Sequence, residues 1–113
     1  MALALNNYVT VPSIAVTNPV GIYTAPAGYN AIVLCAQASS TSDNSQDVTL
    51  AHKREIVGIA VTTYSSYKKP ISSHDTIELT TGKLALSPGD SFILSCSVNN
   101  EIHVLLTVLE TLI

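Results

Sequence analysis

The sequence predicts an all-β protein, a single-domain antiparallel β-sandwich or jelly roll of about eight strands. Short stretches rich in Val, Ile, Thr and Tyr alternate along the chain with clusters of Pro, Gly, Asn, Asp and Ser, as strands alternate with turns. No stretch has the apolar spacing of a long amphipathic helix. The length of 113 residues suits one domain with one hydrophobic core.

Nine segments have the composition of strands. In chain order they are residues 7–11, 20–24, 30–38, 47–53, 55–63, 76–80, 83–86, 91–98 and 102–112. Residues 1–19 are expected to be an N-terminal arm that adds a strand to a neighbouring molecule, or else a plain first strand. Residues 20–113 are expected to form the sandwich domain.

The segments between these strands contain residues that favour turns. Residues 25–28 and 87–90 each place Pro where a φ of about −65° starts a turn, with Gly close behind. Asn99-Asn100 predicts a tight hairpin, because Asn tolerates left-handed backbone geometry. Residues 39–46 are all polar and predict a solvated loop, and residues 64–75 predict the other long connection.

Alternation along a strand assigns its side chains to two faces. The second half of the chain has one consistent inward set, which is Leu84, Leu86, Phe92, Leu94, Cys96, Val98, Ile102, Val104, Leu106 and Val108. The opposite face is also partly apolar, because it includes Ile93, Leu105 and Leu109. The third strand is apolar on both faces, with Ile32, Leu34, Ala36 and Ala38 on one and Ala31, Val33 and Cys35 on the other.

The low charge of the chain predicts that this outward apolar surface is covered. Charged residues make up 12% of the sequence and hydrophobic residues 47%, whereas soluble domains hold about 25% charged residues. The longest apolar run, residues 31–36, is too short to span a membrane. We therefore expect a homo-oligomer, a trimer or a ring, with Val33, Ile93, Leu105 and Leu109 at the interface.

Several other kinds of function are disfavoured. A net charge of −3 with five basic residues does not suit nucleic-acid binding. Residues 72–75 read Ser-Ser-His-Asp, but neighbours on an extended chain point apart, so we interpret them as a turn and expect no catalytic residues. Cys35 and Cys96 lie in apolar runs and are interpreted as free thiols, with a cross-strand disulfide as the alternative. The Cys and His spacings match no metal site, and we expect no cofactor.

The segment around Tyr64, Tyr67 and Lys68 allows two interpretations. Tyrosines beside small polar residues and lysines are typical of contact surfaces, which would touch a subunit, a larger lattice or a glycan. The alternative is a solvated loop whose lysines keep edge strands from pairing. The N-terminus has neither the charged region nor the apolar length of a signal peptide, so synthesis and folding in a cytoplasm are expected.

The chain resembles small all-β virion structural proteins of tailed bacteriophages from about residue 21 to residue 110. The resemblance is carried by Tyr-Thr-Ala-Pro-Ala-Gly at residues 23–28, by Leu-Ser-Pro-Gly-Asp-Ser at residues 86–91, and by the apolar strands at residues 31–34 and 104–110. It implies a virion protein made in the host cytoplasm, with no catalytic residues to carry over.

The resemblance implies a capsid decoration (cement) protein that binds the head lattice, or a neck or tail attachment protein. The expected partners are then copies of the chain itself and other virion proteins such as major capsid or connector proteins, with no nucleic acid and no membrane. A carbohydrate-binding module of a fibre, using Tyr64 and Tyr67, is the alternative from another class, although the chain has no Trp and one Phe.

Overall fold

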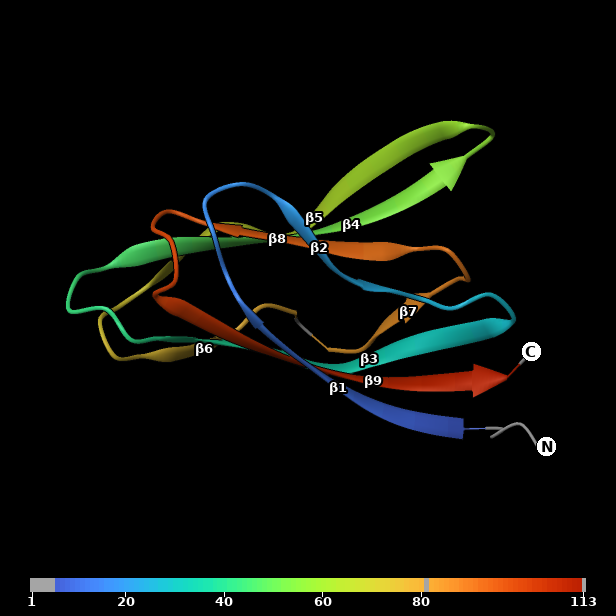
Figure 1. The fold of residues 1–113 in the computed structure, drawn as a ribbon, viewed down its shortest axis with the longest axis horizontal. Helices are drawn as coiled ribbons and strands as arrows, with labels where there is room; N and C mark the ends of the chain where they lie inside the picture. The colour runs from blue at the N-terminus through green and yellow to red at the C-terminus, as the bar shows by residue number, and fades with distance from the viewer. Residues whose placement is uncertain (1–5, 81, 113) are drawn as a thin grey trace.

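The computed structural model describes residues 6–80 and 82–112, which form nine strands in two antiparallel sheets packed face to face (Figure 1). Sheet A has the order β1 (Asn6–Ile14), β9 (Ile102–Leu112), β3 (Tyr29–Ser40) and β6 (Thr76–Glu78), with β7 (Leu84–Leu86) also paired to β3. Sheet B has the order β2 (Val20–Thr24), β8 (Ser91–Cys96), β4 (Gln46–Ile56) and β5 (Ile59–Ile71). The prediction of an all-β sandwich is confirmed. Within the described ranges, no helix is long and apolar enough to cross a membrane.

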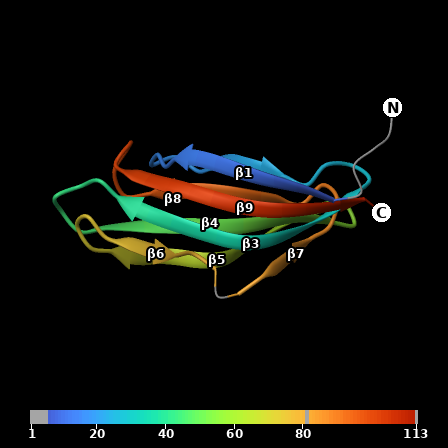
Figure 2. The ribbon, with the colours of Figure 1, turned by 90° about the horizontal axis from the view of Figure 1, so that it is seen from below.

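Sheet A is organised around the long β3–β9 pair. That pair runs from Tyr29 opposite Leu112 to Ser40 opposite Ile102. β1 lies on the other side of β9 and pairs with it over its whole length, so residues 6–14 are a strand of this sandwich. Residues 1–5, to which the arm prediction also applies, lie outside the described residues. β6 and β7 share the opposite edge of the sheet (Figure 2).

The core lies between the sheets and contains most of the predicted inward set. Leu86, Phe92, Leu94 and Cys96 are buried, as are the four alternate residues of β9, Ile102, Val104, Leu106 and Val108. Leu84 is half-buried and packs against this cluster. Val98 was wrongly placed, because β8 ends at Cys96 and Val98 lies in the following turn with 45% of its surface exposed.

A β-bulge in β3 corrects the predicted faces of the third strand. The register against β9 shifts between Val33 and Cys35, so one extra residue sits on β3 and alternation changes phase there. Ala31 and Val33 point inward before the shift, and Ala36 and Ala38 point inward after it. Strict alternation wrongly put Val33 on the outward face, since its side chain is fully buried in the core.

β4 and β5 form a longer hairpin than the sequence predicted. The turn falls at Val57 and Gly58, which have φ values of 51° and 78° and match a two-residue turn with two left-handed positions. The expected strand at residues 55–63 is therefore split by this turn, and the expected connection at 64–75 is mostly strand, because β5 continues to Ile71. Figure 1 shows the end of this hairpin diverging from sheet A.

The other predicted turns are present. A backbone hydrogen bond from Asp75 to Ser72 closes the turn at residues 72–75. Asn100 has the predicted left-handed backbone, with a φ of 67°, but the prediction of a tight hairpin there is wrong, because β8 belongs to sheet B and β9 to sheet A. The predicted loop at residues 39–46 is shorter, because β3 extends to Ser40 and β4 begins at Gln46.

Candidate assembly surfaces

Exposed large apolar side chains gather on three parts of the described chain, and Val20 and Val98 are exposed outside these parts. The first is the hairpin tip, which we define as Ile56, Val57, Ile59 and Val61; Val57 is 94% exposed and Ile59 68%. The second is the outer face of sheet A, with Tyr8, Ile14 and Leu105. The third is the tyrosine pair, Tyr64 and Tyr67 on β5. Exposed apolar groups that gather in this way mark contact surfaces more often than isolated ones do.

The outer face of sheet A has an apolar row across three strands. Leu109 lies opposite Tyr8 of β1 on one side and opposite Ile32 of β3 on the other. Leu105 lies further along the same face, opposite Pro12 and Gln37. Because β9 is central in this sheet, its outward side chains have neighbours on both sides and form a continuous surface.

The outer face of sheet B has a second apolar row. Ala51 of β4 lies opposite Ile93 of β8 and opposite Tyr64 of β5. The rings of Tyr64 and Tyr67 meet edge to face with their centroids 4.6 Å apart. The ammonium group of Lys68 lies 5.5 Å from the centroid of the Tyr67 ring, within the range of a cation–π contact.

The predicted interface residues therefore do not form one surface. Ile93, Tyr64, Tyr67 and Lys68 gather on or beside the outer face of sheet B, and Leu105 and Leu109 lie on the outer face of sheet A. Val33 is in the core and leaves the set. Since the whole sandwich separates the two outer faces, one flat contact cannot include both groups. Contact of these residues with another molecule stays a prediction.

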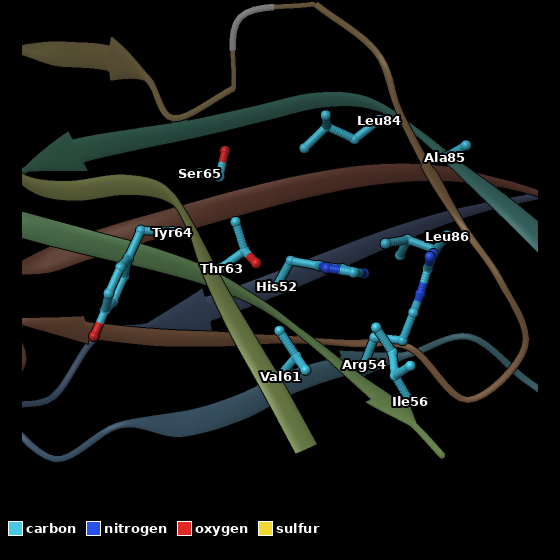
Figure 3. Close-up of a pocket in the computed structure, with 10 residues that line it drawn as sticks. All are labelled: His52, Arg54, Ile56, Val61, Thr63, Tyr64, Ser65, Leu84, Ala85 and Leu86. Atoms are coloured by element: carbon cyan, nitrogen blue, oxygen red, sulfur yellow. The ribbon is translucent and has the colours of Figure 1, made fainter. Parts of the chain in front are cut away.

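A cleft of about 460 Å³ lies between the β4–β5 hairpin and β7 (Figure 3). Ile56 and Val61 of the hairpin line one side, and Leu84 and Leu86 of β7 line the other. Figure 3 shows Arg54 pointing from β4 toward Leu86. The divergence of the hairpin from sheet A leaves Ile56 and Val61 half exposed, without the facing layer that covers the rest of the core.

A buried carboxylate anchors the hairpin close to its projecting tip. Asp90, 3% exposed, accepts hydrogen bonds from Arg54 Nε and Nη2 at 3.0 and 2.6 Å and contacts His52 Nε2 at 3.0 Å. The backbone N–H of Ser87 donates a further bond at 3.0 Å. Burial by itself would raise the pKa of Asp90, but the bonds from Arg54 and His52 outweigh it and lower the pKa to about 2.

The two proline-glycine turns noted in the sequence meet at this anchor. The N–H of Ala25 donates to the carbonyl of Asp90 at 2.8 Å, and the N–H of Gly89 donates to the carbonyl of Ala25 at 2.9 Å. The turn before β8 is thereby bonded to the end of β2 and to the side chain of Arg54. Sequence reasoning treated Asp90 as a turn residue and missed this network.

The three histidines lie in separate parts of the molecule. His52 contacts Asp90, His74 contacts Asp43 at 2.8 Å, and His103 lies on the outer face of sheet A. In the part of the chain that the structure describes, no three His, Cys, Asp or Glu side chains are close enough to hold a metal ion.

Both cysteines are free. Burial raises the pKa of the Cys96 thiol, which donates to the carbonyl of Val98 at 2.9 Å. Cys35 is half-buried on β3, opposite Thr107 of β9.

The hairpin tip was missed by sequence reasoning, which ran a strand through residues 55–63. The signal was present, because Gly58 interrupts an apolar stretch and an isolated Gly in a strand pattern indicates a turn or bulge. Its exposure depends on the hairpin leaving the sandwich, which only the tertiary structure shows.

No protein-family model matches the chain, and no curated protein matches it in sequence. Among solved structures it is similar to a protein of Bacillus endospore appendages, which form a family of disulfide-linked pili; the TM-score is 0.55, the identity 11%, and the match covers 100% of this chain and 96% of that one. It is also similar to a chain of the T13 particle of infectious bursal disease virus, with a TM-score of 0.60 and 5% identity over 96% of this chain. This chain covers only 31% of that viral protein. At these identities the likeness shows the β-sandwich fold.

Proposed function

We propose that this chain is a non-enzymatic structural protein of a bacteriophage virion, an oligomeric capsid decoration (cement) protein that binds the head lattice. The observation that carries the proposal is the exposure of apolar side chains on both outer faces and on the hairpin tip of a chain with 12% charged residues. A monomer seldom leaves such surfaces uncovered. A decoration protein covers them by repeated contacts, each weak, that become strong through many copies.

The similar structures support an assembling role. One belongs to a viral particle and the other to a family of disulfide-linked pili. The resemblance to tailed-phage virion proteins adds the particle type. A neck or tail attachment protein would use the same surfaces, so its distinction from a decoration protein depends on the partner.

The alternative from another class is a carbohydrate-binding module of a fibre. Exposed Tyr64 and Tyr67 favour it, because sugars bind to aromatic faces. Their rings meet at an interplanar angle of 62° and so do not form one flat platform. Binding of the purified protein to a glycan array would support this alternative over assembly.

A second assembling role is a subunit of a filament. It is favoured by the match to the endospore appendage protein, which covers nearly the whole of both chains. Electron microscopy of the concentrated protein separates the two roles, because a filament subunit forms open fibres and a decoration protein forms closed oligomers.

Two measurements test the proposal. Light scattering after size-exclusion chromatography at micromolar concentration should give the mass of an oligomer, at least twice the 11.9 kDa of the single chain. Mass spectrometry of purified particles, with chemical cross-links, should connect the chain to the major capsid protein; links to portal or tail proteins would support the attachment role instead. A monomer that is absent from particles would contradict both.

A further inference from the structure

The two sheets of the described sandwich have four free edges, and three of these edges are poor sites for adding a strand. β6 and β7 have three residues each. β2 has five residues and an irregular register against β8. β1 is longer, but it contains Pro12, which has no N–H to donate. β5, with 13 residues, is the fourth and the longest.

The first half of β5 is open along its free edge. In the part of the chain that the structure describes, β5 pairs with β4 alone, so its other edge presents backbone groups with no strand partner. Near the middle of β5 the hydroxyl groups of Ser65 and Ser66 both donate to the carbonyl of Leu79. These bonds attach the middle of β5 to the segment that follows β6. Residues 59–64 precede this attachment, and all six are exposed.

This open segment lacks the features by which proteins protect an edge strand. Such edges normally have charged residues, Pro or a bulge. The sequence has no charged residue from Ile56 to Tyr67, and its lysines and proline, Lys68, Lys69 and Pro70, come only after the open segment. Lys68 has a φ of 47°, so the strand is also distorted there. The protection therefore begins where the open edge ends.

We infer that residues 59–64 of β5 pair antiparallel with the same segment of a second copy of this chain. The two four-stranded B sheets then form one continuous sheet of eight strands. This inference rests on the proposed assembling role and names the surface that performs it.

The absence of charged residues from this edge allows it to pair with a second copy of itself. In a two-fold antiparallel pair the residue at the axis lies opposite its own counterpart, and the other residues lie opposite residues of the same short segment, so like charges in the segment come close together and destabilise the pair. Residues 59–64 are Ile, Ala, Val, Thr, Thr and Tyr, so no like charges meet. In an antiparallel pair, residues that lie directly opposite each other point to the same face of the sheet, so the two-fold axis lies between two copies of one residue. With Thr62 as that residue, Val61 lies opposite Thr63 and Ala60 lies opposite Tyr64.

The same pairing would cover the cleft. The cleft lies between β5 and β7, which are the neighbouring edges of the two sheets, and Val61 and Leu84 line its two sides. A strand added to β5 lies across the open side of this cleft. Its own Ile59 and Val61 then face β7, and exposed apolar surface of both copies is removed from water. The contact is two-fold, so a trimer or ring needs a further contact on the outer faces.

Thr62→Lys tests the pairing, with Thr24→Lys as its matched control. Both threonines are exposed on an edge strand of sheet B, but Thr24 lies on β2, at the edge opposite to β5. In analytical ultracentrifugation we expect Thr62→Lys to weaken self-association by about 100-fold or more, because two ammonium groups meet at the axis, and Thr24→Lys to change it by less than about threefold. Far-UV circular dichroism checks that both variants keep the β fold.

Cysteine cross-linking provides a second measurement that does not weaken the contact. After mild oxidation, Thr62→Cys should give a covalent dimer, because its thiol lies beside the thiol of the second copy, whereas wild type and Thr24→Cys should not. Oligomers that persist in Thr62→Lys, or the absence of a cross-link in Thr62→Cys, would overturn the pairing and leave the proposed function standing. A monomeric wild type would overturn both.

Discussion

Arg54 and Asp90 are joined by a two-point contact in which Nε and Nη2 of the guanidinium lie 3.0 and 2.6 Å from Oδ2 of the carboxylate. Arg54 belongs to the hairpin that leaves the sandwich, and Asp90 to the turn that starts β8. The ion pair therefore holds the projecting hairpin to the body of the protein. Its carboxylate is buried, which makes loss of either partner costly.

Asp90→Asn should destabilise the fold by on the order of 2 kcal/mol at pH 7, because a neutral amide cannot replace the charge-assisted bonds to Arg54 and His52. Urea unfolding monitored by circular dichroism measures this. Asp43→Asn is the control, since the Asp43 side chain is 89% exposed. Equal unfolding midpoints for the two variants would show that the anchor contributes nothing.

The same carboxylate makes stability depend on pH. The pKa of Asp90 is lowered from 3.8 to about 2 in the folded protein. The unfolded chain therefore binds the proton first as pH falls, so this stabilisation is complete above pH 4 and is lost between pH 4 and pH 2. The free energy of unfolding should fall less steeply over that interval in Asp90→Asn than in wild type. Parallel curves would contradict the anchoring role.

Leu106→Ala and Leu105→Ala should differ in their effect on stability, because one leucine lies in the core and the other on the surface. Leu106 is fully buried between the sheets, and Leu105, its neighbour in β9, is 43% exposed on the outer face. Leu106→Ala should cost about 2–5 kcal/mol of stability, and Leu105→Ala less than about 1 kcal/mol. Thermal unfolding measures both. If Leu105 also contacts another subunit, Leu105→Ala should lower the oligomer mass without changing the fold.

Tyr23 and Glu110 connect the two sheets at the end of the sandwich where β1 begins and β9 ends. The Tyr23 hydroxyl donates to Glu110 Oε2 at 2.6 Å, and burial together with this carboxylate raises the pKa of the phenol. Tyr23→Phe removes the bond and should cost about 1 kcal/mol. Tyr8→Phe is the control, because the Tyr8 ring is 73% exposed. A loss of the same size in both variants would argue against this link.

Gly58→Ala should weaken the hairpin and, with it, assembly. Gly58 has a φ of 78°, where a side chain costs roughly 1–2 kcal/mol. Gly21→Ala is matched, since an added Cβ at Gly21 has its nearest atom 4.0 Å away and its backbone is not left-handed. Sedimentation should show weaker self-association for Gly58→Ala alone. Unchanged association would mean that the hairpin shape is not needed.

Tyr64→Ala combined with Tyr67→Ala tests the tyrosine pair. Both rings are more than half exposed and contact each other, so their loss should change the fold little. Assembly, or binding to particles, should weaken if they form a contact. Leu105→Ala on the opposite face shows whether the effect belongs to sheet B alone.

The sequence by itself determined the fold class, the approximate strands and most of the core. These features depend on local chemistry: alternation places Leu94 and Leu106 inward, and Pro88 and Asn100 favour turns where turns occur. Each such signal lies within a few neighbouring residues, so a single strand or turn contains all of it.

Only the tertiary structure decided which surfaces these strands form. The bulge that buries Val33, the bond between Arg54 and Asp90, and the separation of Leu105 from Tyr64 onto opposite faces all depend on the pairing of segments far apart in the chain. A one-residue shift of register moves a side chain from the core to the surface, and no local pattern records that shift. The low charge of the sequence predicted apolar surface on the outside, and the structure shows that exposed apolar side chains lie on both outer faces and at the hairpin tip.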